Sequence, residues 1–583
     1  MGGHTRRAFL QSAASTLAAA AIPRPQPILS AFPYGTVRLL DGPLKRQLDE
    51  NHAFFLNLSE DRMLKIYRQR AGLAASGEDM GGWYDDFCPG AHFGQYLSAL
   101  ARFAAITRSA PTRAKVHRLV RGLAATMDPS GRFFVDHRYP GYTYDKLVIG
   151  LLDAHSWAGD PNALPALYAA TRAARPHMAG HALTAEEQQQ RPHKDETYTW
   201  DETYTMAENL FLAWERTGDR MFFDMAKRYL LNRTFFDPLA AGQNVLPGLH
   251  AYSHVNALSS GMQGYMKLGD GKYLRAVTNA VELIWKDQSY ATGGWGPNET
   301  FVEPGKGRLG ASLNDTHRHF ETPCGAYAHF KVMRYLLALT RDPRYGDSLE
   351  RVLYNTVLGA LPIREDGSNF YYSDYGQSAR KTYRQPIEES TYRWDHDARW
   401  ACCSGTLPQV VADYGLSAYF RGADGVYVNL YVPSKLTWSK GSLTQTTAYP
   451  DENLVAMKFR LSSPVELTVH LRIPGWAGKG TAVAVNGRRE RAALQPGTFL
   501  ALRRTWKTGD VIELDLDQPL RTEPIDAQTP DRVAVLRGSR VLFAILDDQP
   551  VLRGNRPDPG IPLKGFAEIP AGAVYQTYWR VAA

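Results

Sequence analysis

The sequence predicts a multidomain protein in which an (α/α)6 helical barrel is followed by an all-β sandwich domain. At 583 residues the chain is too long for one ordinary hydrophobic core. Helical hairpins repeat between about Asp49 and Ala360, and short segments rich in β-branched residues begin after about Ala418. We therefore expect the barrel to occupy residues 28–418 and one or more β-sandwich domains to occupy residues 419–583.

Each helical hairpin is recognisable by its turn, where Gly or Pro ends one helix and Asp or Ser caps the next. Such turns are ITRSAPTRAKV, WAGDPNALPAL, RTGDRMFFDMA, KLGDGKYLRAV and LTRDPRYGDSLE. They recur roughly every 50–70 residues, which indicates a helical repeat with insertions. A sixth hairpin is expected from Leu56–Arg68 and the helix after Cys403. A closed ring of six hairpins gives the barrel, whereas an open array would be a binding scaffold.

The C-terminal part of the sequence reads as strands. Its apolar segments are short, several alternate with period two, and Gly, Asn, Pro and Asp turns separate them. The segments are GVYVNLYVP, LVAMKFRLS, VELTVHLRIPGW, TAVAVNG, TFLALRRTW and DVIELDLDQPL. This pattern is typical of a β-sandwich.

The N-terminus predicts export. Its TRRAFL block, with Arg6 and Arg7 before an Ala/Leu stretch, resembles a twin-arginine signal, which we expect to cover residues 1–27. The stretch from Ala8 to Ile22 is too short and too polar for a membrane span, and no later segment is apolar enough. The expected location is therefore the periplasm, and a disordered basic tail is the alternative.

Charge and composition limit the partners. The 67 Lys and Arg residues are scattered and nearly balanced by 59 Asp and Glu, so no basic patch points to nucleic acid. The chain contains 12 Trp, 31 Tyr and 23 Phe, and aromatic side chains suit the faces of sugars, although most must belong to the core.

Three of the four cysteines fall in two motifs. Cys402 and Cys403 are adjacent in RWACCSGTLPQ, and Cys324 follows Glu321 by three residues in HFETPCGAY. Together they offer three sulfurs and a carboxylate, a plausible four-coordinate site for zinc. A thiolate that also faced a pocket would be a nucleophile. The alternatives are buried core cysteines, which we expect for Cys88, or disulfides, although a bond between Cys402 and Cys403 would be strained.

A long Gly-rich loop between two helical hairpins carries further carboxylates. In TGGWGPNETFVEPGKGRLG, Glu299 lies near Trp295 and Phe301. Apolar surroundings would raise its pKa and suit a general acid. The alternative is a solvated loop glutamate, which is the better interpretation of Glu303.

Five segments carry motifs in a characteristic order: FGQYLSALARFAA, YTYDKLVIGLLDAH, ETPCGAYAHFKVMRYLLALTRDPRYGDSLERVLYNTVLGAL, CCSGTLPQVVADYGLSAYF and HLRIPGWAG. In these motifs the chain resembles the β-L-arabinofuranosidase family, glycoside hydrolase family 127 and its close relatives. The resemblance implies an (α/α)6 barrel with β-sandwich domains. It also implies a retaining mechanism with a zinc-bound cysteine nucleophile and a glutamate acid/base.

The resemblance also implies roles for individual residues. Cys402 matches the nucleophile and Glu299 the acid/base, while the zinc ligands are matched by Glu321, Cys324, Cys402 and Cys403. Sugar-binding positions are matched by Glu350, His250, Tyr372 and Asp145.

Three departures from the family pattern bear on these roles. Pro323 puts two residues between Glu321 and Cys324 where the family has one, a shift of about 100° around a helix. Asp145 replaces a common histidine, and His254 stands where glutamine is expected.

The expected function is release of β-L-arabinofuranose, or a similar pentofuranose, from an oligosaccharide or polysaccharide of plant type by double displacement. A glycosidase for another sugar, such as an acidic branched sugar of pectin, is one alternative. A second is a non-catalytic polysaccharide-binding protein with structural zinc. A third is a lyase that uses His250 and Tyr252, which would leave the sulfur cluster unexplained.

Overall fold

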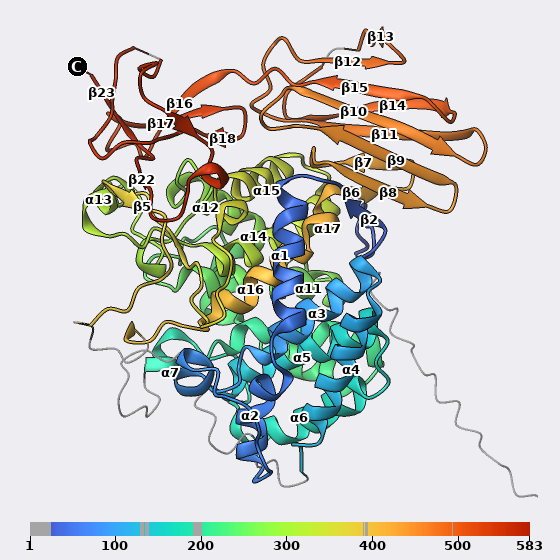
Figure 1. Cartoon of the computed structure of the whole chain (residues 1–583), viewed down its shortest axis with the longest axis vertical. Coiled ribbons are helices and arrows are strands. Elements are labelled where there is room, and N and C mark those ends of the chain that lie inside the picture. The colour runs from blue at the N-terminus through green and yellow to red at the C-terminus, as the bar shows by residue number, and fades with distance from the viewer. Residues whose placement is uncertain are drawn as a thin grey trace, which may run out of the picture.

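A computed structural model describes residues 25–128, 133, 139–189, 201–388, 390, 395–492, 494–554 and 556–582. The expected export signal falls almost entirely on residues 1–24, outside the described part of the chain. A helical body forms one half of the molecule and two β modules sit side by side against one end of it (Figure 1). The predicted order of a helical barrel followed by β structure is confirmed.

Six helices form a closed inner ring in which each packs on the next and the last packs on the first. In ring order they are α3 (Phe93–Thr107), α5 (Pro140–Ala158), α8 (Met206–Thr217), α11 (Ala251–Leu268), α14 (Thr322–Thr340) and α16 (Cys402–Ala412). These helices are buried on nearly every face, because neighbours in the ring and an outer layer enclose them.

Six outer helices pack around the inner ring. They are α1 (Pro43–Asn57), α4 (Ala110–Ala124), α6 (Ala163–Ala174), α9 (Arg220–Arg228), α12 (Gly271–Asp287) and α15 (Arg344–Asn355). Two of them, α1 and α4, each contact two inner helices. The apolar residues of the outer helices fall on one face, which is the pattern of an amphipathic helix whose other face is exposed to solvent. Shorter helices lie between or beside them: α2 (Glu60–Arg70), α7 (Ala185–Gln189), α10 (Asp237–Ala240), α13 (Arg308–Asp315) and α17 (Tyr414–Ala418).

The hairpin turns form as expected. Gly159, Gly218 and Gly269 end α5, α8 and α11 in the left-handed conformation. Asp219 and Asp270 then cap α9 and α12 by accepting backbone N–H groups. The expectation for the sixth hairpin was wrong in one partner, because α16 packs on α1, whereas α2, which includes most of Leu56–Arg68, packs on α4.

Glycine allows the closest helix contact in the ring. A Cβ atom added at Gly94 of α3 would lie 1.9 Å from the carbonyl oxygen of Lys146 in α5, and one at Gly150 would lie 2.4 Å from the oxygen of Gly94. Any side chain at either position would therefore force the two helices apart.

Two sheets make the first β module. One has the order β1-β6-β7-β11-β14 and the other β13-β12-β15-β10-β9-β8-β2. The strands after the barrel are β6 (Tyr419–Arg421), β7 (Gly425–Val428), β8 (Ser434–Trp438), β9 (Gly441–Thr447), β10 (Leu454–Leu461), β11 (Val465–Ile473), β12 (Ala482–Val485), β13 (Arg488–Arg489), β14 (Thr498–Trp506) and β15 (Val511–Asp515).

The sandwich also takes two strands from the start of the chain, which the sequence pattern did not indicate. β1 (Ser30–Ala31) pairs with β6, and β2 (Val37–Leu39) pairs with β8. The segment before the barrel thereby ties the sandwich to the helical body.

A third sheet forms the second β module, with the order β16-β17-β23-β20 and β18 beside β17. Its strands are β16 (Leu520–Pro524), β17 (Arg532–Arg537), β18 (Arg540–Val541), β20 (Val551–Leu552) and β23 (Trp579–Val581). Three small ladders complete the structure: β3 (Phe320–Glu321) with β4 (Tyr372–Ser373), β5 (Ala379–Arg380) with β22 (Val574–Tyr575), and β19 (Phe543–Ala544) with β21 (Leu563–Lys564).

None of the helices in the described ranges is both long and apolar enough to cross a bilayer.

Candidate functional site

The N-terminal ends of the inner helices meet at one pocket. Cys402 is the first residue of α16, Glu321 immediately precedes α14, and Tyr252 is the second residue of α11. The pocket is narrow, with a cavity volume of about 20 Å³ between its walls. It is lined by Trp83, Phe87, Cys88, Tyr139, Tyr142, Glu202, Tyr252, Glu321 and Cys402. Because helix N-termini carry partial positive charge, this end of the ring favours anionic groups.

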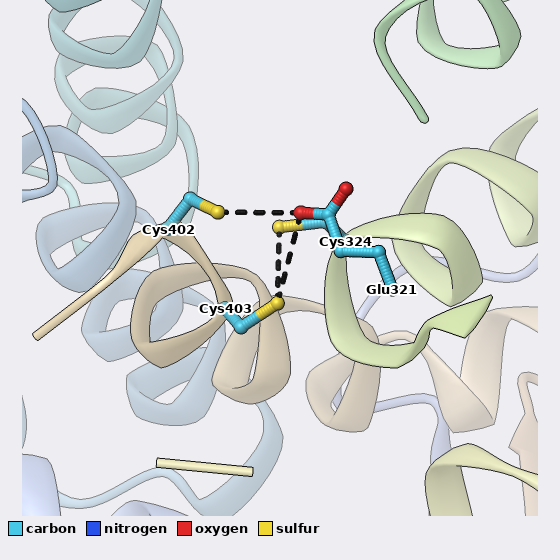
Figure 2. Close-up of side chains that lie close together, drawn as sticks. All are labelled: Glu321, Cys324, Cys402 and Cys403. Atoms are coloured by element: carbon cyan, nitrogen blue, oxygen red, sulfur yellow. Dashed lines mark hydrogen bonds between the residues drawn. The ribbon is translucent and has the colours of Figure 1, made fainter. Parts of the chain in front are cut away.

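Four sulfur and carboxylate donors converge beside this pocket. Glu321 and Cys324 come from the start of α14, and Cys402 and Cys403 come from the start of α16, with their polar atoms pointing toward one another (Figure 2). Glu321 Oε1 lies 3.3 Å from Cys402 Sγ and 3.8 Å from Cys403 Sγ. Cys403 Sγ lies 3.5 Å from Cys324 Sγ. Residues 79 to 82 positions apart in sequence thus form one cluster.

The extra residue Pro323 does not remove Cys324 from the cluster. The helix begins at Thr322, so Pro323 occupies its second position and Cys324 its third. Proline is tolerated there because the first-turn N–H groups have no partner within the helix. The Cys324 thiol therefore still faces Cys403, and all four donors lie within 4.8 Å of one another.

The donor set fits a tetrahedral thiophilic ion. Ligand atoms at zinc–sulfur and zinc–oxygen distances of ~2.0–2.3 Å are about 3.5–3.8 Å apart around one tetrahedral centre. The measured separations of 3.3, 3.5 and 3.8 Å match this spacing. The other carboxylate oxygen, Glu321 Oε2, points away from the sulfurs (Figure 2) and is buried with no hydrogen-bond partner among the described residues. This Glu/Cys cluster could hold a metal ion.

The protonation balance of the cluster also favours a cation. Burial would raise the pKa of the Cys402 thiol, but hydrogen bonds from Cys324 and Cys403 outweigh it, and the pKa lies well below its usual value. Burial and the charge on Cys402 raise the pKa of Glu321 well above its usual value. Burial likewise raises the pKa values of Cys324 and Cys403. One buried thiolate thus suppresses ionisation of its three neighbours, a repulsion that a divalent cation would relieve.

A second group of polar residues adjoins the cluster through Glu321. His250, the N-cap of α11, places Nε2 3.2 Å from Glu299 Oε2 and 4.0 Å from Glu321 Oε2. The hydroxyl of Tyr372 donates to Glu299 Oε1. The structure therefore brings together His250, Glu299 and Tyr372, three residues expected at the site.

The Glu299 backbone is held in an unusual conformation. Asn298 and Glu299 have φ values of 53° and 60°, which are uncommon for residues other than glycine and cost of order 1–2 kcal/mol each. Asn298 N–H donates to the carbonyl of Arg318 at 2.7 Å, and Thr300 forms an antiparallel bridge with His250. These contacts aim the Glu299 carboxylate at His250 instead of at solvent.

The expected raised pKa of Glu299 was wrong. Burial does act to raise it, but hydrogen bonding and charge from His250 outweigh burial, with help from Arg384 and Tyr372. The pKa of Glu299 is therefore lower than usual. The sequence showed apolar Trp295 and Phe301 nearby, whereas His250 and Arg384 come from distant segments.

Glu202 is a site residue that the sequence reading missed. Burial raises its pKa to about 7, its Oε1 lies 3.6 Å from His250 Nδ1, and its Oε2 has no hydrogen-bond partner among the described residues. Its position just before α8 parallels that of Glu321 just before α14. This placement, an acid directly ahead of an inner helix in TWDETYT, was the available signal.

Family models match the chain over most of its length. The model of the β-L-arabinofuranosidase GH127 catalytic domain matches residues 36–416, and that of the GH127 middle domain matches residues 425–518. The chain belongs to the GH127 family. This membership confirms the resemblance found in the sequence motifs.

Individual relatives are more distant. A non-reducing end β-L-arabinofuranosidase from Bifidobacterium longum subsp. longum is 25% identical over 254 residues, which cover 41% of this chain and 37% of that protein. A crystal structure of a GH127 β-L-arabinofuranosidase from Geobacillus stearothermophilus T6 is 18% identical, covers 94% of this chain and all of the other, and has a TM-score of 0.69. A GH127 β-arabinofuranosidase structure is 19% identical with a TM-score of 0.73, covering 95% and 98% of the two chains. These structures share the fold.

The structure does not bring Glu350 to the site of this GH127 chain. Glu350 lies on α15 with a fully buried carboxylate, 3.0 Å from the Arg472 guanidinium of β11 and 3.3 Å from Trp476 Nε1. This corrects the expectation that it binds sugar, because its partners belong to the β-sandwich and its side chain has no exposure. Its place is the contact between barrel and sandwich.

Asp145 also lies away from the pocket lining. Its carboxylate accepts hydrogen bonds from Lys146 (3.1 Å), Thr205 (3.0 Å) and Asn209 (2.7 Å). The Lys146 ammonium in turn lies 4.3 Å from the ring centre of Tyr142, which lines the pocket. Asp145 is thus one layer behind the pocket, and direct contact with sugar stays a prediction.

Proposed function

We propose that this GH127 protein is a retaining glycoside hydrolase that releases β-L-arabinofuranose, or a closely similar pentofuranose, from plant-type glycans. The observation that carries the proposal is the position of Cys402, whose thiol lines the pocket and also belongs to the Glu321–Cys324–Cys403 cluster. A purely structural metal site would have no need to place one of its sulfurs in the lining of a pocket. Family membership supports the reaction class, and the names of the arabinofuranosidase relatives support the sugar.

Glu321, Cys324, Cys402 and Cys403 would hold zinc, whose chemical contribution is to keep buried thiols ionised. The protein itself supplies an ionised Cys402 at a helix N-terminus and a carboxylate pair, Glu299 and Glu321, bridged by His250.

In the first step, the Cys402 thiolate attacks the anomeric carbon from the pocket floor, and the bond from that carbon to the leaving oxygen breaks. Glu299 transfers a proton to the leaving oxygen. A bound sugar desolvates Glu299 further, which raises its pKa toward that of a proton donor. His250, in contact with Glu299 and Glu202, holds the acid in position.

In the second step, Glu299 removes a proton from water, the water oxygen attacks the anomeric carbon, and the carbon–sulfur bond breaks to restore the Cys402 thiolate. The low pKa of Glu299 in the empty pocket suits this role as a base. Two inversions at the same carbon retain the anomeric configuration.

A panel of aryl glycosides of both anomers of arabinofuranose and other pentoses, with zinc quantification, tests the proposal. We expect release of aryl alcohol from the β-L-arabinofuranoside, one zinc per chain, and a first-formed sugar of unchanged anomeric configuration by NMR. We expect Cys402→Ser to lose at least ~10³-fold in kcat. Wild-type turnover in Cys402→Ser would overturn the nucleophile assignment. An inert β-L-arabinofuranoside beside a cleaved alternative would overturn the sugar.

A further inference from the structure

An open basin is connected to the proposed acid residue, Glu299, through Tyr372. Its volume is about 450 Å³, and its walls include Arg318, Tyr372 and Arg384. Tyr372 donates its hydroxyl hydrogen to Glu299, and the charge of Arg384 lowers the Glu299 pKa. Since Glu299 delivers its proton to the leaving oxygen, a leaving group departs toward these walls.

A second basin, of about 410 Å³, adjoins the first, because both are lined by Tyr383, Arg384 and Gln385. Among the described residues, five arginines line the two basins: Arg318, Arg364, Arg380, Arg384 and Arg399. Two carboxylates line them, Asp374 and Asp397.

Both lining carboxylates already have partners. Asp374 Oδ2 lies 2.8 Å from His317 Nδ1, and its Oδ1 lies 3.3 Å from His319 Nδ1. Asp397 pairs with Arg399 at 2.7 Å. The lining acids therefore do not neutralise the other four arginines.

One further carboxylate, that of Asp395, forms ion pairs with two of these arginines. Its Oδ1 lies 2.7 Å from Arg384 and 3.7 Å from Arg318. Arg384 Nε and Nη1 are nevertheless buried with no hydrogen-bond partner among the described residues. Arg380, exposed on β5, makes one long contact of 3.4 Å with the carbonyl of Gly572. Arg318 and Arg380 thus border the first basin with donors to spare.

We propose, on the basis of the function proposed above, that this arginine-lined basin binds a carboxylate-bearing sugar, a uronic acid, as the leaving group of the hydrolysed bond. Guanidinium groups recognise carboxylates through paired N–H donors. Among the described residues, no lysine lines either basin, so the side chains with a permanent positive charge there are all of the type that binds carboxylates in this way. Tyr372 and Tyr383 also line the first basin, and aromatic side chains of this kind suit contact with a sugar ring.

Two substrates that differ in one charge test the inference. The first is a β-L-arabinofuranosyl glycoside of a uronic acid, and the second is its methyl ester. We expect kcat/KM for the acid to exceed that for the ester about tenfold, and the ratio to fall toward one at high ionic strength. We expect Arg318→Gln and Arg380→Gln each to lower the ratio several-fold. Arg488→Gln, on strand β13 of the sandwich, is the matched control and should leave it unchanged.

A binding measurement separates this inference from the proposed function. Calorimetric titration of the protein with the free uronic acid, which has no glycosidic bond to hydrolyse, and with its methyl ester measures binding in the basin without turnover. Tighter binding of the acid that weakens in Arg380→Gln supports the basin even if no arabinofuranoside is cleaved. Equal binding and equal kcat/KM for acid and ester would overturn the inference, and cleavage of the aryl β-L-arabinofuranoside would show that the function stands without it.

Discussion

Tyr372 is the register partner of Glu321 in the two-stranded β3–β4 ladder, and its hydroxyl donates to Glu299 Oε1. One short ladder thus sets the proposed acid/base relative to a carboxylate of the sulfur cluster. The ladder is further tied by Thr322 and Ser373, whose hydroxyls lie 2.7 Å apart. The position of Glu299 relative to Glu321 therefore depends on one backbone ladder and one side-chain hydrogen bond.

Tyr372→Phe should shift the pH dependence of the reaction. The Tyr372 hydroxyl donates to the ionised form of Glu299 and so lowers its pKa, and its removal raises that pKa. If the first step needs protonated Glu299, the alkaline limb of the kcat/KM profile moves to higher pH, by a few tenths to about one unit. Tyr265→Phe, near the opposite end of α11 from His250, is the control. An unchanged alkaline limb would contradict the contact's proposed role.

Glu299→Gln should separate substrates by their leaving groups. Glutamine keeps the shape of the side chain but cannot transfer a proton. We expect kcat/KM to fall about 10²–10⁴-fold for an unactivated disaccharide and much less for an aryl glycoside whose leaving group needs no proton. Steady-state kinetics on the two substrates measures this. Equal losses on both would indicate that Glu299 has another role.

Cys324→Ala should remove a metal ligand despite the inserted Pro323. The Cys324 thiol lies 3.5 Å from Cys403 Sγ, so its loss opens the donor set. We expect zinc affinity to fall at least about 100-fold, measured by competition with a chelator. Cys88→Ala is the matched control, because Cys88 lines the pocket but lies outside the four-donor cluster. Full zinc retention by Cys324→Ala would exclude it as a ligand.

Glu350 and Arg472 should matter for stability and not for sugar affinity. Arg472→Met leaves the carboxylate of Glu350 buried without its cation, which costs about 3–5 kcal/mol of unfolding free energy. Glu350→Gln should lower the melting temperature while KM for an aryl arabinofuranoside stays within about twofold of wild type. A large rise in KM at unchanged melting temperature would instead indicate that Glu350 binds the sugar.

The buried His329 should make stability fall as the solution is acidified. Burial lowers its pKa from 6.5 to about 4, and its ring bonds to Ser348 at 3.1 Å. Between these values the unfolded chain binds a proton that the folded chain does not, so its stabilising contribution is complete above pH 6.5 and declines below it. From pH 7 to 5 the loss is about 2 kcal/mol.

Replacing this histidine provides the check. Melting temperatures of wild type and His329→Asn between pH 7 and 5 should show a smaller pH dependence for the variant, while exposed His177→Asn should follow the wild type. Identical pH dependence in all three proteins would refute this account of His329.

Periodicity and turn chemistry sufficed to predict most of the fold. The Gly-Asp pairs at Gly218–Asp219 and Gly269–Asp270 end one helix and cap the next, and these are local effects that a sequence displays directly. The helix opposite α16 was misplaced and the strands β1 and β2 were missed, because their pairing joins segments almost 400 residues apart. No local pattern encodes such a contact.

The sequence by itself pointed to the cluster of three cysteines and a glutamate, because these residues fall in two short motifs at the starts of helices. Tertiary structure decided what surrounds them. Three features depend on partners from other elements. They are the low pKa of Glu299, the burial of Glu202 beside His250, and the ion pair of Glu350 with Arg472. Electrostatic effects act through space over a few ångströms, so the state of a carboxylate follows from its neighbours in the folded molecule and not from its neighbours along the chain.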